Sequence, residues 1–248
     1  MRPGFVVLVG ILQAAGPHRP ITSPRELLEA MRARYEGKWY RTVTFVQHNT
    51  EHHPDGTVGR SVWREWLMAP GKLRIEFAPA DSGNGMLFTN DSQYVFRGDS
   101  TILARPFVHP LLVLGFDVYA YPSTKTMDLL ARRGFDLSVL SEATWEGRPV
   151  WVVGAKAGDL RTRQFWVDKE RLVFVRMLAP AGPDTTKTAE TRFSKYLPLA
   201  GGWIAPEVEF LLEGRRQFLE EYRDIQANVA IPAASWDARR WKAARLPR

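Results

Sequence analysis

Short segments in which apolar and polar residues alternate, separated by turn residues, recur from Trp39 almost to the end of this 248-residue chain. The clearest is Lys72–Phe77, where Leu73, Ile75 and Phe77 occupy every second position. An alternation of period two places one side of a strand on a core and the other toward solvent. The pattern therefore predicts an antiparallel meander, and a sheet of so many strands has to curl or close.

Comparable strands are predicted at Tyr40–His48, Ser61–Met68, Met86–Thr89, Gln93–Arg97, Val139–Trp145, Val150–Lys156, Arg163–Val167, Leu172–Leu178, Thr188–Leu197, Glu207–Leu212 and Phe218–Ile225. Turn signals such as Asp55-Gly56, Pro70-Gly71, Asn90-Asp91 and Glu146-Gly147 lie between them. Such punctuation is typical of hairpins.

Two helices are expected beside the strands. Ser23-Pro24 begins the first, and apolar residues recur at helical spacing until Gly37. The second, Ser123–Arg133, follows Phe107–Phe116, the most apolar segment of the mature chain. An apolar insertion midway through a meander has to bury one side, and we expect it to lie as a lid across the open face of the curved sheet.

The net charge of +7 is concentrated at the end of the chain, where five basic residues and one acidic residue occupy the last twelve positions. The remainder is near neutral, which argues against a nucleic-acid-binding face. Residues 233–248 are therefore interpreted as a basic, solvated tail, with contact to anionic lipid or an acidic partner as the alternative. The chain has no cysteine, so it has no disulfide, thiolate nucleophile or cysteine zinc site.

The N-terminus resembles a secretory signal. Arg2 precedes an eight-residue apolar run, Phe5–Leu12, and small residues follow as far as Gly16. Residues 1–16 are predicted to be a signal peptide, with a buried strand as the alternative. Between residues 20 and 232 no shift in composition marks a linker, so a single domain is expected there.

Catalytic and metal motifs are weak. The sequence contains no G-x-S-x-G, H-E-x-x-H or G-x-x-x-x-G-K motif, and no cofactor is expected. His48, His52 and His53 cluster with acidic residues near the first hairpin turn, which admits a metal site, but their spacing matches no metal motif and a polar, solvated hairpin tip is the preferred interpretation. His109 in the apolar insertion admits a pH-dependent gate, or a histidine satisfied by a backbone group.

Aromatic residues crowd the predicted strands, and some strands carry bulky apolar residues on both faces. A sheet that is apolar on both faces needs a helix or lid on one, and exposed apolar area of that size is a liability unless it serves binding. This favours a protein that holds a hydrophobic partner.

Several segments, in this order, resemble the LolA family of periplasmic outer-membrane lipoprotein carriers. The helix Pro24–Tyr35 and the strand residues Tyr40–Gln47 are followed by Trp66–Phe77, which contains a P-G-K-x-R-x-x-F block. Leu87–Phe96 resembles the family's short strand pair, and Arg163–Asp168 with Leu172–Leu178 its later hairpin. The resemblance covers residues 23–230.

The resemblance implies a mostly β fold with a few helices: an incomplete antiparallel barrel covered by a helical lid, in the periplasm. It implies a non-enzymatic, monomeric carrier that takes lipoprotein or lipid acyl chains from inner-membrane donor proteins to outer-membrane acceptors, with at most peripheral membrane contact. The expected cavity and lid residues are Val43, Phe45, Trp63, Trp66, Ile75, Phe77, Phe88, Phe96, Phe107, Leu111, Leu112, Leu114, Phe116, Trp151, Phe165 and Phe174.

One position departs from the family. Where the carriers have an arginine that latches the lid before the proline of the second turn, this chain has Ala69, and Arg64 or Arg74 is the candidate substitute. Two other functions stay open on this scaffold. One is a sensor of lipids or mislocalised lipoproteins; the other is a hydrolase, which would require an acid/base pair inside the cavity.

Overall fold

A strongly curved antiparallel sheet forms the body of the protein in the computed structural model, which describes residues 20–244 except 80 and 183. The proposed signal segment lies outside these residues. The main sheet runs in the order β6-β5-β4-β3-β2-β1-β15-β14-β11-β10-β9-β8-β7 and does not close into a barrel. The predicted fold class, an incomplete antiparallel barrel covered by helices, is confirmed.

The strands of one half of the sheet are β1 (Thr42–His52), β2 (Val58–Met68), β3 (Lys72–Phe77), β4 (Gly85–Thr89), β5 (Ser92–Arg97) and β6 (Ser100–Pro106). Those of the other half are β7 (Leu140–Trp145), β8 (Arg148–Val153), β9 (Gln164–Asp168), β10 (Phe174–Ala181), β11 (Asp184–Ser194), β14 (Glu207–Leu212) and β15 (Arg215–Ala227). A separate small ribbon pairs β12 (Leu197–Leu199) with β13 (Gly202–Ile204).

Strand β6 was not predicted from the sequence. It forms one edge of the sheet, and all seven of its residues are exposed. An edge strand with no buried side has no need of alternation, so the pattern that revealed its neighbours is missing here. The first hairpin is also longer than predicted, because β1 and β2 stay paired as far as His52 and Val58.

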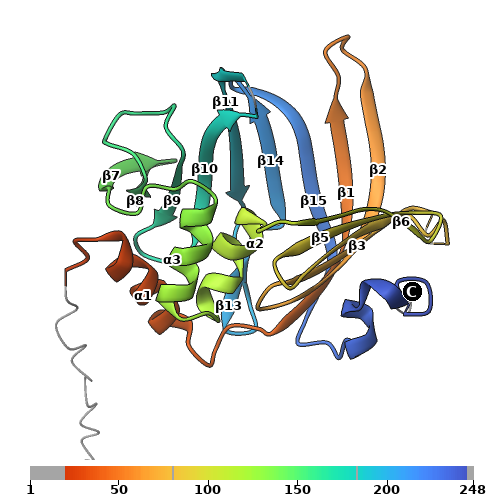
Figure 1. Cartoon of the computed structure of the whole chain (residues 1–248). Helices are drawn as coiled ribbons and strands as arrows, with labels where there is room; N and C mark the ends of the chain where they lie inside the picture. Colours follow the sequence, from red (N-terminus) through yellow and green to blue (C-terminus); the bar gives the residue numbers. More distant parts are fainter. Residues whose placement is uncertain (1–19, 80, 183, 245–248) are drawn as a thin grey trace, which may run out of the picture.

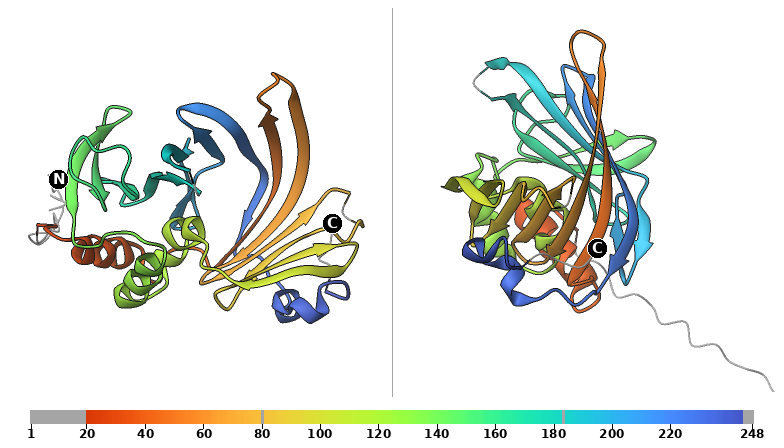
Figure 2. Two further views of the ribbon diagram at one scale, coloured as in Figure 1. Left: turned by 45° about the horizontal axis from the view of Figure 1, so that its top comes forward. Right: turned by 90° about the vertical axis from the view of Figure 1, so that its right-hand side faces the viewer.

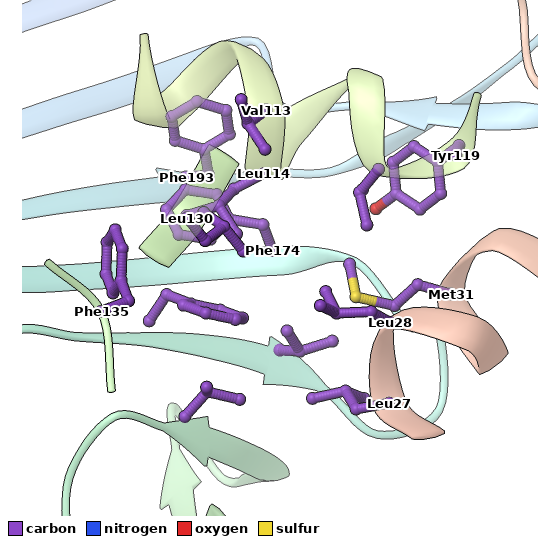
Figure 3. Packing of buried hydrophobic residues seen from close by; sticks show 14 of the residues in the cluster. Leu27, Leu28, Met31, Val113, Leu114, Tyr119, Leu130, Phe135, Phe174 and Phe193 are labelled. Carbon is purple, nitrogen blue, oxygen red and sulfur yellow. The ribbon is translucent and has the colours of Figure 1, made fainter. Parts of the chain in front are cut away.

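Helix α1 (Pro24–Tyr35) begins and ends where the sequence predicts. The Ser23 hydroxyl accepts a hydrogen bond from the Glu26 amide, and Gly37 has a φ of 71° just after the helix. Four apolar side chains, Leu27, Leu28, Met31 and Tyr35, are buried. Figure 3 shows the first three packed toward Phe174 and its neighbours on the sheet.

Helices α2 (Pro110–Gly115) and α3 (Ser123–Arg132), joined through a 3-10 turn at Asp117–Tyr119, lie with α1 on the concave side of the sheet (Figures 1 and 2). They cover the region of β8–β11 and meet β3 and β4. Strands β1, β2, β14 and β15 extend well beyond them. The helices therefore cover only part of the concave face.

The C-terminal segment packs on the convex face as far as Trp241, so the predicted solvated tail is wrong for residues 233–241, whereas Lys242 and Ala243 are exposed (Figure 2). Residues 233–241, here called the clasp, contain the 3-10 turns Ala233–Trp236 and Ala238–Arg240. Trp236 and Trp241 are buried against Trp66, Leu87 and Phe96. The two tryptophans bury apolar area here, which a count of charged residues does not show.

Arg74 joins the clasp to the sheet. Its side chain is fully buried, and its guanidinium pairs with Glu76 at 2.7 Å. It also donates to the backbone carbonyls of Ser235 and Trp241 at 3.3 and 3.1 Å, and stacks over the Trp241 ring at 3.8 Å. The Trp241 ring in turn lies parallel to that of Phe96 at 4.2 Å. Such a buried charge is tolerated because its hydrogen-bonding positions are matched.

Candidate functional site

The concave face of β1, β2 and β15 carries the candidate site. Gln47 on β1 stands between Trp63 on β2 and Tyr222 on β15 in the strand register, and Asn49 stands between Ser61 and Glu220. Because side chains alternate between faces, the partners across an antiparallel pair point to the same side. Six neighbouring positions in the middle of the sheet therefore face one concave surface.

Four aromatic rings extend across this surface, and we call them the aromatic row. The ring of Trp63 lies 4.9 Å from that of Phe77 and 5.8 Å from that of Phe218, whose ring is 6.0 Å from Phe210. They come from four strands: β3, β2, β15 and β14. All four side chains are partly exposed. Trp63, Phe77 and Phe210 pack at the margin of the core, and part of each ring remains exposed on the concave face.

Two carboxyl groups lie among these rings. Glu65 follows Trp63 on the same side of β2 and is 6% exposed, and Glu220 precedes Tyr222 on the same side of β15. Their charges interact with each other. We call Glu65 and Glu220 the acid pair. Within the described part of the chain, neither forms an ion pair with a basic side chain.

Hydrogen bonds reach only one member of the acid pair. The Tyr222 hydroxyl donates to Glu220 at 2.8 Å, and Gln47 is its second donor. Gln47 also donates to Asn49 Oδ1 at 2.7 Å, and Asn49 donates to the Ser61 hydroxyl at 3.2 Å. The carboxyl of Glu65 has no hydrogen-bond partner among the described residues. Its oxygens are not among the fully buried polar atoms that lack a partner, so they keep contact with solvent.

Burial raises the pKa of both carboxyls. For Glu220 it raises the pKa to about 7, against the opposing effect of the hydrogen bonds from Tyr222 and Gln47. Burial also raises the pKa of Glu65 well above its ordinary range, and the neighbouring charge of Glu220 adds to this. Desolvation penalises the charged form, and two like charges penalise it further. The acid pair therefore retains protons at a pH where exposed glutamates have lost theirs.

The lid is tightly packed against the sheet beside this surface. Leu112 and Phe116 of the lid are buried with Val43, Leu73 and Phe88 of the sheet. The space enclosed between lid and sheet near Phe107 is about 20 Å³, room for about one water molecule. An acyl chain therefore does not fit beneath the lid in this conformation.

Asp117 ties the lid to the turn between β2 and β3. Its carboxylate accepts a hydrogen bond from the Gly71 amide at 2.8 Å, and burial raises its pKa to about 7. Neither Arg64 nor Arg74 replaces the family's latch arginine. Arg74 is held by the clasp on the convex face, and Arg64 lines a pocket there with Thr44 and Val46.

His109 has a structural role, and the histidines near the first hairpin turn form no metal-binding cluster. His109 caps α2, since its Nδ1 accepts from the Leu112 amide at 3.3 Å, and burial lowers its pKa to about 4. This matches the second alternative for His109, a histidine satisfied by backbone. In the described residues no group of three or more His, Cys, Asp or Glu is arranged to hold a metal ion.

The predicted site residues separate into three groups. On the concave face, next to the acid pair or under the lid, lie Val43, Phe45, Trp63, Ile75, Phe77, Phe88, Phe107, Leu112 and Phe116. In the core between the helices and β8–β10 lie Leu111, Leu114, Trp151, Phe165 and Phe174. On the convex face, under the clasp, lie Trp66 and Phe96.

The placement of Trp66 with Trp63 in one cavity is wrong. Residues three positions apart in a strand point to opposite faces, and the clasp covers the face that Trp66 occupies. The acid pair was missed for the same reason. Glu65 falls on the same parity as Trp63 and Leu67, and Glu220 on that of Phe218 and Tyr222. A carboxylate on the apolar side of a strand is the signal that could have revealed it.

No family model and no curated protein matches the chain, but solved structures do. A DUF1329 family protein from Desulfovibrio piger superposes with a TM-score of 0.59 at 14% identity, over 90% of this chain and 98% of that one. A domain assigned to outer membrane lipoprotein sorting, from Vibrio parahaemolyticus, gives 0.58 at 14% identity over 88% and 97%. A LolA superfamily protein from Nitrosomonas europaea gives 0.57 at 10% identity over 88% and 98%.

The chain has a LolA-like fold. The match spans nearly the full length of each neighbour, so the whole architecture, and not one hairpin motif, is shared. Among the described residues, no helix is long and apolar enough to cross a membrane.

Proposed function

We propose that the protein is a non-enzymatic periplasmic carrier that binds the acyl chains of lipoproteins or related lipids on its concave face. The observation that carries this proposal is the aromatic row. Four partly exposed rings from four strands form one continuous apolar strip beside the lid. Exposed apolar surface of this kind is unfavourable in a soluble protein unless a partner covers it.

Apolar burial provides enough energy for such a carrier. Each methylene that leaves water contributes about 0.8 kcal/mol, so ten methylenes laid on the strip supply a gross gain of about 8 kcal/mol. No cofactor is required for this. The LolA-like fold supports the proposal, since one structural neighbour is assigned to lipoprotein sorting.

In this proposal the ligand site lies beside the lid and not under it. The space under Leu112 and Phe116 is filled by the protein's own side chains, whereas the aromatic row is accessible without any movement. In this proposal the ligand first lies on the row and extends beneath the lid only when the Asp117–Gly71 contact opens. Loading and release then depend on lid movement.

Detergent-free purification followed by native mass spectrometry tests the proposal. A co-purifying lipid, lost when the protein is delipidated, is the expected result. Delipidated protein should then enhance the fluorescence of N-phenyl-1-naphthylamine, an uncharged apolar probe, and dodecanol should displace it. A protein that neither retains lipid nor binds the probe would contradict the carrier function.

A second function is favoured by one observation, the acid pair. Hydrolysis of a glycoside commonly uses two carboxyls, of which one is protonated and one ionised, and the raised pKa of Glu65 together with that of Glu220 near 7 permits this division. Turnover of nitrophenyl glycosides or esters that is lost in both Glu65→Gln and Glu220→Gln would support a hydrolase. The absence of turnover with these substrates leaves the carrier as the better assignment.

A further inference from the structure

The acid pair is unlike the other carboxylates that the sheet buries. Glu76 is paired with Arg74, Glu190 with Arg176 and Arg192, and Asp168 with Arg148. Each of these carboxylates therefore has its counter-charge within the chain. Glu65 and Glu220 have none among the described residues, although Glu65 is as buried as Glu76. Leaving a buried carboxyl without a cation destabilises a protein by several kcal/mol when the group is ionised.

Aromatic rings surround the acid pair in a way that suits a positive charge. Phe45, the register partner of Glu65 on β1, stacks on Tyr222 at 4.1 Å between ring centres. Tyr222 also holds Glu220 through its hydroxyl. Trp63 lies one row above Glu65 on the same strand. The faces of aromatic rings attract ammonium groups, most strongly when water is excluded.

We propose that the concave face binds an amphiphile whose polar group is a protonated amine or quaternary ammonium, with Glu65 and Glu220 as its counter-charges and the aromatic row as the bed of its acyl chain. This inference rests on the proposed carrier function and specifies its ligand. The ammonium supplies the missing cation, and Glu65 gains the partner that the fold does not give it.

The geometry of the site sets the orientation of the ligand. Glu65 lies between the buried cluster of Val43, Leu67 and Leu73 and the partly exposed ring of Trp63. The ammonium therefore lies deep, at the edge of the core, and the chain runs outward along the aromatic row. An anionic lipid head gains no counter-charge at the same position, because no basic side chain among the described residues forms an ion pair with the acid pair. The empty site carries a proton instead, in agreement with the raised pKa of both carboxyls.

Four dodecyl amphiphiles test the proposal on the delipidated, full-length protein: dodecylammonium, dodecyltrimethylammonium, dodecanol and dodecanoate. Each displaces N-phenyl-1-naphthylamine at pH 7 and below its micellar concentration. We expect the two cations to bind about tenfold more tightly than dodecanol, the size of one hydrogen-bonded or ring-bound charge, and dodecanoate to bind most weakly. This arm uses the wild-type chain, so it does not depend on whether a variant folds.

The variants Glu65→Gln and Glu220→Gln, which keep side-chain size, should lose the preference for the cations by about tenfold and leave dodecanol unchanged. Glu221→Gln is the matched control, because Glu221 is the next residue on the same strand, points to the other face and pairs with Arg223. Its cation preference should equal that of the wild type.

The possible failures are distinguishable. Equal binding of all four amphiphiles, or tighter binding of dodecanoate, overturns the ammonium site and leaves the carrier function intact. Binding of none of them overturns both. A cation preference that survives in Glu65→Gln and in Glu220→Gln moves the charge site elsewhere and overturns the assignment to the acid pair.

Discussion

Strands β2 and β3 bury one glutamate on each face of the sheet, and only the glutamate on the convex face has a counter-charge among the described residues. On the convex face Glu76 is matched by Arg74, and the clasp seals the pair from water with Trp241. On the concave face Glu65 has no counter-charge, and partly exposed aromatic rings stand beside it. The two carboxyls are separated by only the thickness of the sheet. The ion pair on the convex face stabilises the fold. On the concave face, a cation from outside the chain would stabilise the unpaired carboxyl.

The largest effect on stability should come from removing the ion pair on the convex face. Arg74→Met leaves Glu76 buried without a cation and removes the donor to the carbonyls of Ser235 and Trp241. The free energy of unfolding should fall by about 4 kcal/mol, measured by urea denaturation. Arg60→Met, on an exposed position of β2, is the control and should change it by less than about 0.5 kcal/mol. A small loss in Arg74→Met would show that the pair is dispensable.

The next effect tests whether the clasp belongs to the fold. Trp241→Ala removes a buried ring that stacks on Phe96 and on Arg74, and donates to the Gly83 carbonyl at 3.1 Å. Stability should fall by about 3 kcal/mol, as for other buried aromatic truncations. Thermal unfolding followed by circular dichroism measures it. An unchanged midpoint would return the clasp to the status of a solvated tail.

The acid pair on the concave face should make the stability of the protein depend on pH. Because the pKa of Glu220 rises from 4.5 to about 7 on folding and that of Glu65 also rises, the folded chain binds more protons than the unfolded chain between these values. Stability from this source is therefore complete below about pH 4.5 and is lost as the pH rises through about 7. The wild type should lose about 2 kcal/mol more than the Glu65→Gln, Glu220→Gln double variant between pH 5 and pH 8.

The comparison with the double variant is needed because other groups titrate in the same range. Asp117 has a pKa raised to about 7 and contributes in the same direction, and His109, whose pKa is lowered to about 4, contributes in the opposite one. Both remain in the double variant, so they cancel in the difference. Tyr222 faces the acid pair, but burial raises its pKa beyond this range. Parallel profiles of stability against pH for the two proteins would mean that folding does not raise the pKa of the acid pair.

The smallest effect separates binding from stability with two tryptophans of one strand. Trp63→Ala should weaken binding of N-phenyl-1-naphthylamine by about tenfold, or about 1.4 kcal/mol, with a modest loss of stability because the ring is partly exposed. Trp66→Ala removes a ring buried under the clasp, so it should lower stability and leave probe binding unchanged. Weaker binding in both variants to the same degree would contradict the separation of the two faces.

Local patterns in the sequence determined most of the elements. The alternation in Lys72–Phe77 and the cap at Ser23 act over a few residues, so β3 and α1 appear where the pattern places them. The apolar segment Phe107–Phe116 had to be covered, and it is, as the lid. The edge strand β6 escaped prediction because no face of it is buried, which removes the only signal that alternation provides.

Only the tertiary structure decided which residues meet across long distances. Glu65 and Glu220 are 155 positions apart in the chain and share one surface because β15 pairs with β1 beside β2. Arg74 meets Trp241 because the chain returns to the convex face after β15. The alternation of apolar and polar residues predicts which face of its strand a side chain occupies, but not which strands are neighbours. Strand order is set by burial summed over the whole sheet, so the sequence alone determined the elements and the fold decided the site.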